Sequence, residues 1–452
     1  MSHSVFRAIQ TSSLLQALPL SLPVGPYSTR SPPAPWQFTA STTAYFSATF
    51  AFIIGLQLFL LVPMRLAWKQ CVAAPVLAAL FILPLVLVST ESPAIQLMHA
   101  GVCISTFMRM FDLYFVTPWR IGREPVLDFD EWRREMWRPF RNICVKDKTK
   151  QDTEDKKTIE PKAIGGLQQQ QRRYNTRQSQ HENAVPSVAK RGSPPAPQRT
   201  LCHWTFYLPR YIFYMTTVEV TTFVFSFMTV EQIQSLSIIP RFFVLLSLAI
   251  CIICFISLWY YSNMFAWAIL TGGLIDDTDW TYVRHGFPLF ATSPDDFWKR
   301  WHHLFQYIWI DLGLKPTKML LRKYVTGKNM VHHRTAAVLE MALPVMSVFV
   351  LSGLMHEYMF MTTWPDYAGY MMAYFLIQGV ATLASKGLQI ALGRRFGGVV
   401  PVAVWVVLTV LFNAATGALF LEPIIRNGGL VMGARQSVLV RLYNYLRANS
   451  VF

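Results

Sequence analysis

The sequence predicts an all-α membrane protein, a polytopic bundle of about eight transmembrane helices with a short amphipathic surface helix. Hydrophobic residues make up 53% of the 452 residues and charged residues only 15%, which leaves too little polar surface for a soluble protein of this size. Apolar runs of about 20 residues, long enough to cross a bilayer, recur along the chain. Most of the protein is therefore expected to lie in lipid.

Seven spans are clear apolar runs, and an eighth contains charged residues. The seven are Thr42 to Met64, Cys71 to Ser89, Tyr211 to Val230, Phe242 to Leu270, Ala336 to Phe360, Tyr367 to Leu392 and Val399 to Leu421. The eighth, Ala94 to Val116, contains His99, Arg109 and Asp112, so we expect it to face the bundle rather than lipid. Arg109 and Asp112 are three residues apart on this helix and are expected to form an ion pair.

The spans divide the chain into four regions. Residues 1–41 form an N-terminal tail without the pattern of a cleaved signal peptide, and residues 42–145 hold three spans and a juxtamembrane segment. Residues 146–200 are rich in Lys, Gln, Glu and Pro, and they predict a disordered basic insert because they cannot bury enough apolar surface to offset their ordering entropy. Residues 201–452 hold the remaining spans.

The net charge of +16 is carried mainly by segments between the spans, which favours contact with anionic lipid at a cytosolic membrane face over nucleic acid. Arg65 and Lys69 follow the span that ends at Met64, and Arg394 and Arg395 follow the span that ends at Leu392, so these ends are expected in the cytosol with the N-terminus in the lumen. His356 then lies toward the lumenal end of its helix. The arginines after Leu421 would also become lumenal, so a re-entrant segment there stays open.

The cysteines and histidines predict neither disulfides nor a metal site. The six cysteines form no disulfide framework, and Cys251 and Cys254 lie within one apolar helix, where packing explains them. The pairs His302-His303 and His332-His333 lack the further upstream histidine of membrane di-iron sites, so no metal is expected.

The most informative motif is the segment Ser293-Pro-Asp-Asp-Phe-Trp-Lys-Arg-Trp-His-His303. Residues 293–309 predict a short amphipathic helix at the membrane surface, with Ser293 as N-cap and Pro294 as first helical residue. One face would carry Trp298, Trp301, Phe305 and Ile308. Anchoring at the membrane interface explains the tryptophans but not the histidines beside them.

A second motif, Ser352-Gly-Leu-Met-His-Glu-Tyr358, lies inside an apolar run. Ionisable groups in hydrocarbon cost about 2.5 to 3.5 kcal/mol on insertion scales, so they persist where they pair, line a cavity or react. His356 is therefore the leading catalytic candidate. Glu357 faces another direction on the helix and is not expected to orient His356.

Together the two motifs resemble the signature regions of membrane-bound O-acyltransferases, most of all the wax-synthase-like branch, which includes fungal enzymes that acetylate terpenoid and meroterpenoid metabolites. The resemblance is strongest over residues 270–420. It implies that His356 is catalytic, that His302 is its companion, and that residues 201–452 form the catalytic region. It further implies a substrate site lined by Asp296, Trp298, Arg300 and Trp301. Plant wax synthases carry Asn in place of His302 and one more residue between the tryptophans, a departure from this sequence.

The chemistry of acyl transfer fits these residues. A base must remove the proton of the acceptor hydroxyl as it attacks the thioester, and imidazole is suited to that task. His356 would be this base, His302 would orient the acceptor or the thioester carbonyl, and Trp298 and Trp301 would wall the chamber. Bulky side chains at both motifs favour a short acyl group.

The expected cosubstrate is therefore acetyl-CoA, with no bound cofactor, and the expected acceptor is a lipophilic secondary metabolite with a hydroxyl group, of terpenoid or meroterpenoid type. By resemblance the protein is expected in the endoplasmic reticulum as an integral multi-pass protein. Two alternatives stay open: a long-chain wax ester synthase, and a non-enzymatic transporter that uses its intramembrane His and Glu.

Other polar residues have two explanations each. Glu219, Glu340 and Asn413 either hydrogen-bond between helices or line an acceptor cavity. A basic stretch either binds the phosphates of coenzyme A or meets anionic lipid; it consists of Lys315, Lys318, Arg322, Lys323 and Lys328.

Overall fold

The computed structural model confirms an all-α architecture. It describes residues 40–86, 93–137, 201–270, 272–276, 280, 288–301, 305–326, 332–364, 369–392, 399–427 and 437–448. Helices dominate this part of the chain, and its one sheet is a short antiparallel pair of strands, β1 (Leu201–His203) and β2 (Leu274–Asp276). The predicted insert and most of the predicted N-terminal tail lie outside the described residues.

Four helices are long and apolar enough, by length and composition, to cross a membrane. They are α3 (Leu66–Val86), α11 (Ile238–Leu270), α15 (His333–Thr363) and α17 (Val399–Arg426). The other four predicted spans also coincide with helices: α2 (Ala40–Phe59), α4 (Pro93–Phe111), α9 (Leu208–Phe225) and α16 (Tyr370–Leu392). The chain is thus a polytopic membrane helix bundle, and the crossing by all eight helices stays a prediction.

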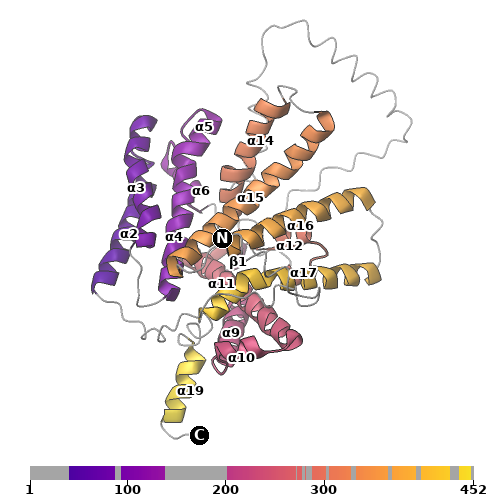
Figure 1. Ribbon diagram of the computed structural model, residues 1–452. Coiled ribbons are helices and arrows are strands. Elements are labelled where there is room, and N and C mark those ends of the chain that lie inside the picture. Colours follow the sequence, from indigo (N-terminus) through magenta and orange to yellow (C-terminus); the bar gives the residue numbers. More distant parts are fainter. Residues whose placement is uncertain are drawn as a thin grey trace.

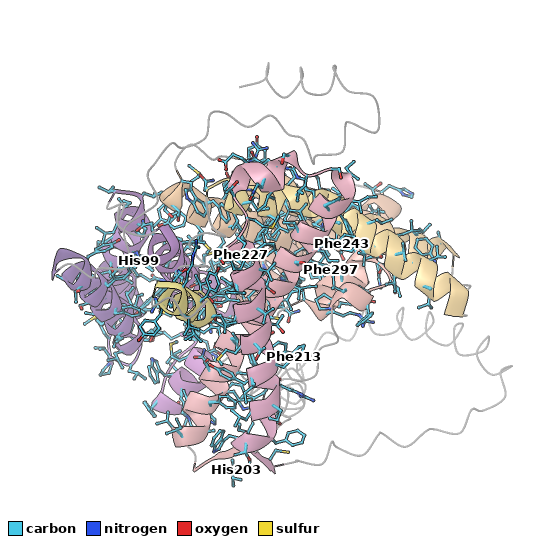
Figure 2. The ribbon with its side chains drawn as sticks, turned by 90° about the horizontal axis from the view of Figure 1, so that it is seen from below. His99, His203, Phe213, Phe227, Phe243 and Phe297 are labelled. Carbon is cyan, nitrogen blue, oxygen red and sulfur yellow. The ribbon has the colours of Figure 1, made fainter. Side chains whose placement is uncertain are left out.

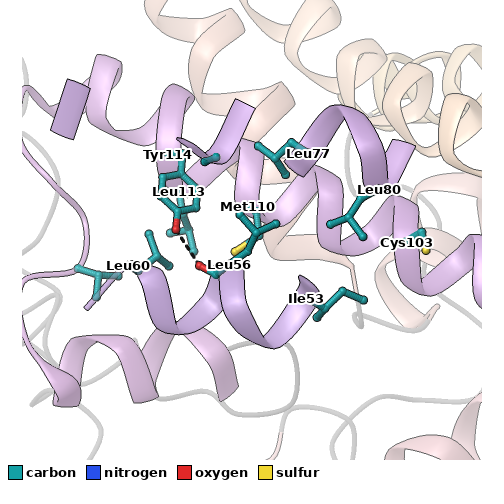
Figure 3. Close-up of a cluster of buried hydrophobic side chains, with 11 residues drawn as sticks. Ile53, Leu56, Leu60, Leu77, Leu80, Cys103, Met110, Leu113 and Tyr114 are labelled. Carbon is teal, nitrogen blue, oxygen red and sulfur yellow. Dashed lines mark hydrogen bonds between the residues drawn. The ribbon is translucent and has the colours of Figure 1, made fainter. Parts of the chain in front are cut away.

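The first three helices share one hydrophobic cluster. Leu56 of α2, Leu60 directly after it, Leu77 and Leu80 of α3, and Met110 of α4 are buried together in one cluster (Figure 3). The helix α4 continues into a π-helical turn, Asp112–Val116, and then into α5 (Thr117–Ile121), which ends at Gly122 with φ of 74°. In the π-helical turn Tyr114 donates a hydrogen bond of 2.7 Å to the carbonyl of Leu56 and so joins α4 to α2.

The predicted ion pair within the eighth span is confirmed. Arg109 donates to the Asp112 carboxylate at 2.8 Å, and both side chains are buried. Arg109 also pairs with Glu135 of α6 (Phe129–Trp137) and lies 3.9 Å from Asp311. Because a buried charge without a counter-charge is costly, these carboxylates explain how an arginine is accommodated in this helix.

The helix α15 lies at the centre of the bundle. It packs against α4 on one side and α16 on the other, as the orange ribbon between the purple N-terminal helices and the α16–α17 pair shows in Figure 1. The helix α17 then packs on α11, and α11 packs on α9. The C-terminal helix α19 (Val438–Ala448) contacts α9, where the rings of Tyr443 and Phe223 are 5.8 Å apart.

The prediction of one amphipathic surface helix over residues 293–309 is wrong. Ser293 does cap a helix, since its side chain accepts from the backbone N–H of Asp296 at 3.1 Å, but α12 covers only Pro294–Arg300. The backbone of Trp301 is extended, with ψ of 165°, so the helical path stops there. A separate helix α13 (Gln306–Trp309) follows, and it continues through a π-helical turn, Ile310–Leu314, into α14 (Lys315–Leu321).

This break separates the apolar residues that were expected to share one face. Trp298 packs with Phe349 and Phe375, whereas Ile308 belongs to another cluster with Met355. Two short helices can therefore fill two different gaps between the long helices, which one straight helix of the same length could not do.

Candidate active site

A cavity of about 350 Å³ lies between α11, α12, α13, α15, α16 and α17. Aliphatic side chains of α11, among them Leu245, Ile252 and Ile256, form one wall. Aromatic rings from the other helices line the rest, including those of Phe349 and Phe420. The lining residues all fall between positions 245 and 421, within the region expected to be catalytic.

His356 projects from α15 to this cavity. Its Nδ1 lies 2.8 Å from the carbonyl oxygen of Ser352, one turn earlier on the same helix. Since a carbonyl only accepts hydrogen bonds, Nδ1 carries the proton, and Nε2 of the neutral ring keeps its lone pair. No residue among those described accepts from or donates to Nε2.

Two aromatic rings fix the plane of the imidazole. The ring centroid of Phe375 is 4.7 Å from that of His356, and the centroid of Phe420 is 5.5 Å away. These contacts, together with the bond to Ser352, leave the histidine one orientation, with Nε2 available to a molecule in the cavity.

Both predicted tryptophans line the cavity, and a buried hydrogen-bond network holds one of them. The indole N–H of Trp298 donates to Oε1 of Gln378 at 3.0 Å. The amide nitrogen of Gln378 donates in turn to Asn413 at 3.3 Å and to Thr416 at 2.9 Å. Gln378 is fully buried and uses its amide in all three bonds, so it joins α12, α16 and α17 at the cavity wall.

Sequence reasoning missed Gln378. It lies within an apolar run in the same way as Glu219 and Asn413, both of which were singled out, and an embedded amide gives the same signal. Only the positions of its three partners, which come from two other helices, show its role.

Asp296 and Arg300 pair with each other on α12 and are not among the side chains that line the cavity. The Arg300 Nε donates to Asp296 at 2.9 Å, and the backbone N–H of Thr292 donates to the same carboxylate at 3.0 Å. Partial burial raises the pKa of Asp296, but the bonds from Arg300 and Thr292 outweigh it and lower the pKa below the ordinary 3.8. The pair stabilises the turn that carries Trp298, and a part in substrate binding stays a prediction.

The remaining predicted residues fall into three groups. His302 and His303 lie outside the described residues, as does Lys328. Glu357 does not bond to His356, as expected, but accepts from the backbone N–H groups of Gly369 and Met372 at the start of α16. Of the basic stretch, Lys315 pairs with Asp311 at 2.5 Å, and none of its described members lines the cavity.

The three embedded polar residues make hydrogen bonds between segments. Glu219 accepts from Ser437 at 2.6 Å, and Glu340 accepts from Thr326 at 2.5 Å. Asn413 accepts from Gln378 and also lines the cavity, so both explanations hold for it. Within the described ranges, no group of three or more His, Cys, Asp or Glu side chains is placed to hold a metal ion.

The fold and the cavity define a class: a membrane helix bundle with a largely apolar chamber that the oriented His356 lines. Residues 284–377 match the model of the membrane bound O-acyl transferase family. This match runs from before α12 into α16, and it includes both Trp298 and His356.

A curated relative supports the same family. It is the Arabidopsis thaliana protein named probable long-chain-alcohol O-fatty-acyltransferase 3, and it is 31% identical over 144 residues. The aligned part is 31% of this chain and 39% of the relative, so the chain spans about two fifths of that relative's length. Both similarities cover only part of the chain, and both agree with the family that the two motifs resemble.

Proposed function

We propose that this protein is an acyl-CoA-dependent O-acyltransferase with His356 as its base. The observation that carries the proposal is the tautomer of His356: Nδ1–H is bound to Ser352, and Nε2 is open to an apolar cavity. A histidine with that geometry can take a proton from a bound alcohol. The segment that holds it matches the membrane-bound O-acyltransferase family.

The reaction follows from this geometry. The acceptor oxygen attacks the thioester carbonyl while its proton moves to Nε2 of His356, and a tetrahedral oxyanion forms. When the oxyanion collapses, the carbon–sulfur bond breaks and the proton on Nε2 passes to the departing thiolate. The products are an ester and free coenzyme A. Throughout, the Ser352 carbonyl accepts from Nδ1–H and stabilises the imidazolium that forms.

His302 is the proposed companion that orients the acceptor or the thioester carbonyl, because it follows Trp301, which lines the cavity. We further propose that all eight helices that coincide with predicted spans cross the membrane. The N-terminus would then be lumenal, with the insert and α12 on the cytosolic face of the endoplasmic reticulum.

For the substrates we propose acetyl-CoA and a lipophilic polycyclic alcohol of terpenoid type. The size of the cavity supports this choice, since about 350 Å³ is near the lower end of the range for small-molecule sites. The rings of Phe375 and Phe420 against His356 also favour a short acyl group at the reacting carbon.

A second candidate is long-chain wax ester synthesis. The printed name of the Arabidopsis thaliana relative is that of a long-chain-alcohol O-fatty-acyltransferase. The aliphatic wall that α11 presents to the cavity would suit an alkyl chain.

Competition between donors tests the proposal. Purified protein in lipid nanodiscs is given equal amounts of acetyl-CoA and palmitoyl-CoA, with either a polycyclic terpenoid alcohol or hexadecanol as acceptor. We expect the acetyl ester of the polycyclic alcohol and an equal amount of free coenzyme A. Palmitoyl esters of hexadecanol would favour the wax ester synthase instead. Unchanged thioester with every pair would contradict an acyltransferase and favour the transporter alternative.

A further inference from the structure

Thr382 on α16 lines the cavity and carries a buried hydroxyl. Its side chain is among those that line the cavity, and only 8% of the residue is exposed. Among the described residues, its Oγ1 has no hydrogen-bond partner. A buried hydroxyl that lacks a partner is unfavourable unless a bound molecule supplies one, so this atom marks a point where a ligand can bind.

Two other polar side chains that line the cavity are already engaged with the protein. Thr409 also lines the cavity, but its hydroxyl donates to the carbonyl of Trp405 at 2.7 Å. Asn413 donates to the carbonyl of Thr409 at 2.8 Å and accepts from Gln378. The Thr382 hydroxyl therefore differs from its neighbours because its hydrogen-bonding capacity is unused.

The position of Thr382 along α16 relates it to the candidate base. Phe375, which packs on His356, and Thr382 are seven residues apart, which is about two turns, or about 10 Å, on the same side of a helix. One turn further, Ser385 accepts from the backbone N–H of Asp295 at 3.3 Å, so Thr382 lies toward the start of α12. The cavity thus has the candidate base beside Phe375 and an unpartnered hydroxyl about two turns further along α16.

We propose that Thr382 is a second anchor for the substrate and binds a polar group about two helical turns from the reacting atoms. This inference rests on the proposed acyltransferase function. The ligand it fits is an otherwise apolar chain or ring system with one hydrogen-bonding group at that spacing. A plain alkyl chain would leave the hydroxyl without a partner.

Two molecules of the reaction carry such a group. The pantetheine arm of an acyl-CoA contains amides on a flexible chain, and an oxygenated acceptor carries a second hydroxyl or carbonyl. Both offer a partner for a hydroxyl, which can donate or accept. The variant Thr382→Val keeps the side-chain shape and removes the hydroxyl, so it can tell the two sources apart.

The test measures KM separately for acyl-CoA, for a dihydroxy polycyclic acceptor and for its monohydroxy counterpart. We expect Thr382→Val to raise the KM of the ligand that Thr382 binds about tenfold, and Thr382→Ser to return this KM to the wild-type value. A rise for acyl-CoA identifies the amide, and a rise for the dihydroxy acceptor alone identifies the second oxygen. The matched control is Thr362→Val, a buried threonine outside the cavity whose hydroxyl donates to Met359.

Thermal shift of the protein by each ligand supplies a readout that needs no turnover. We expect a smaller shift in Thr382→Val than in wild type for the ligand that Thr382 binds. Equal shifts and KM values within twofold for all ligands would overturn the proposal. If the wild type makes no ester, but the ligand raises its unfolding temperature more than that of Thr382→Val, the proposed reaction is wrong while the proposed role of Thr382 in binding is supported.

Discussion

Among the described residues, His99 and His356 lie in the interior of apolar helices, and they differ in what surrounds the ring. His99 on α4 is 4% exposed and lies among the N-terminal helices, away from Phe297 in the view of Figure 2, and it is not among the residues that line the cavity. Its Nδ1 lies 3.5 Å from the hydroxyl of Tyr45, and its Nε2 is 3.3 Å from Thr49 and 3.5 Å from Cys103. Both ring nitrogens therefore have partners.

In His356 only one ring nitrogen has a protein partner among the described residues, and the side chain lines the cavity. Nδ1 is bound to Ser352, while Nε2 has no partner among the residues that the structure describes. A histidine in a membrane helix is thus not by itself a sign of catalysis. The distinction between a structural and a reactive histidine lies in the second ring nitrogen, because a base needs a free lone pair next to space for a substrate.

The largest effect is expected for His356→Ala. Loss of a general base lowers the rate by about a hundredfold to ten thousandfold, so ester formation should fall to that extent in protein that remains monodisperse in detergent. The measurement is ester product by mass spectrometry. Added imidazole should restore part of the rate, because the variant leaves space for it beside the cavity. Normal turnover in this variant would exclude His356 as the base.

A smaller effect is expected at His302. His302→Ala should lower the rate by about a hundredfold, the usual cost of one donor to a developing oxyanion, whereas His302→Asn should retain more activity. Asn can still donate and accept a hydrogen bond, and Ala cannot. Equal losses in the two variants would instead indicate proton transfer or packing at this position.

Gln378→Leu tests the network that holds Trp298. Removal of the amide leaves buried groups of Trp298 and Asn413 without partners, so we expect a loss of about 3 kcal/mol in the free energy of unfolding and an activity about tenfold lower. Gln389→Leu, on the same helix, is the matched control: this exposed residue makes one hydrogen bond, to Ser293, and the change should cost less than about 0.5 kcal/mol. Equal costs for the two variants would contradict the network.

The smallest effect concerns pH and the ion pair on α12. Because the pKa of Asp296 is below 3.8 in the folded protein, its contribution to stability is complete well above pH 3.8 and is lost as the pH falls through the folded pKa. The difference in thermal stability between wild type and Asp296→Asn should therefore be present at neutral pH and disappear in acid. A difference that is independent of pH would show that the carboxylate charge does not matter.

The sequence alone predicted much of the fold, and it singled out His356, which the structure places at the cavity. Hydrophobic runs located the long helices to within a few residues, and the Arg109–Asp112 pair followed from helical spacing, because both signals are local. The break at Trp301 could not be predicted in this way. The continuous pattern over 293–309 also suits a single helix, and the break depends on where α15 and α16 leave space for Trp298.

Prediction from the sequence has the same limit at the cavity. His356 and both tryptophans were predicted from two short motifs, but the bond to Ser352 and the role of Gln378 depend on distances. The open hydroxyl of Thr382 gave no signal at all, since a threonine in an apolar helix usually bonds to its own backbone. A buried hydroxyl without a partner can be recognised only from the positions of the atoms around it.

The most direct test of the distinction between the two histidines compares His356→Gln with His99→Gln in one preparation. Both acceptor-dependent release of free coenzyme A and the midpoint of thermal unfolding are measured. We expect His356→Gln to lose release while its unfolding midpoint stays near that of wild type. His99→Gln should unfold at a lower temperature and retain most of its release. Release of coenzyme A by His356→Gln at the wild-type rate would contradict a reactive His356 and a structural His99. A loss of activity in both variants that only follows their loss of stability would contradict it as well.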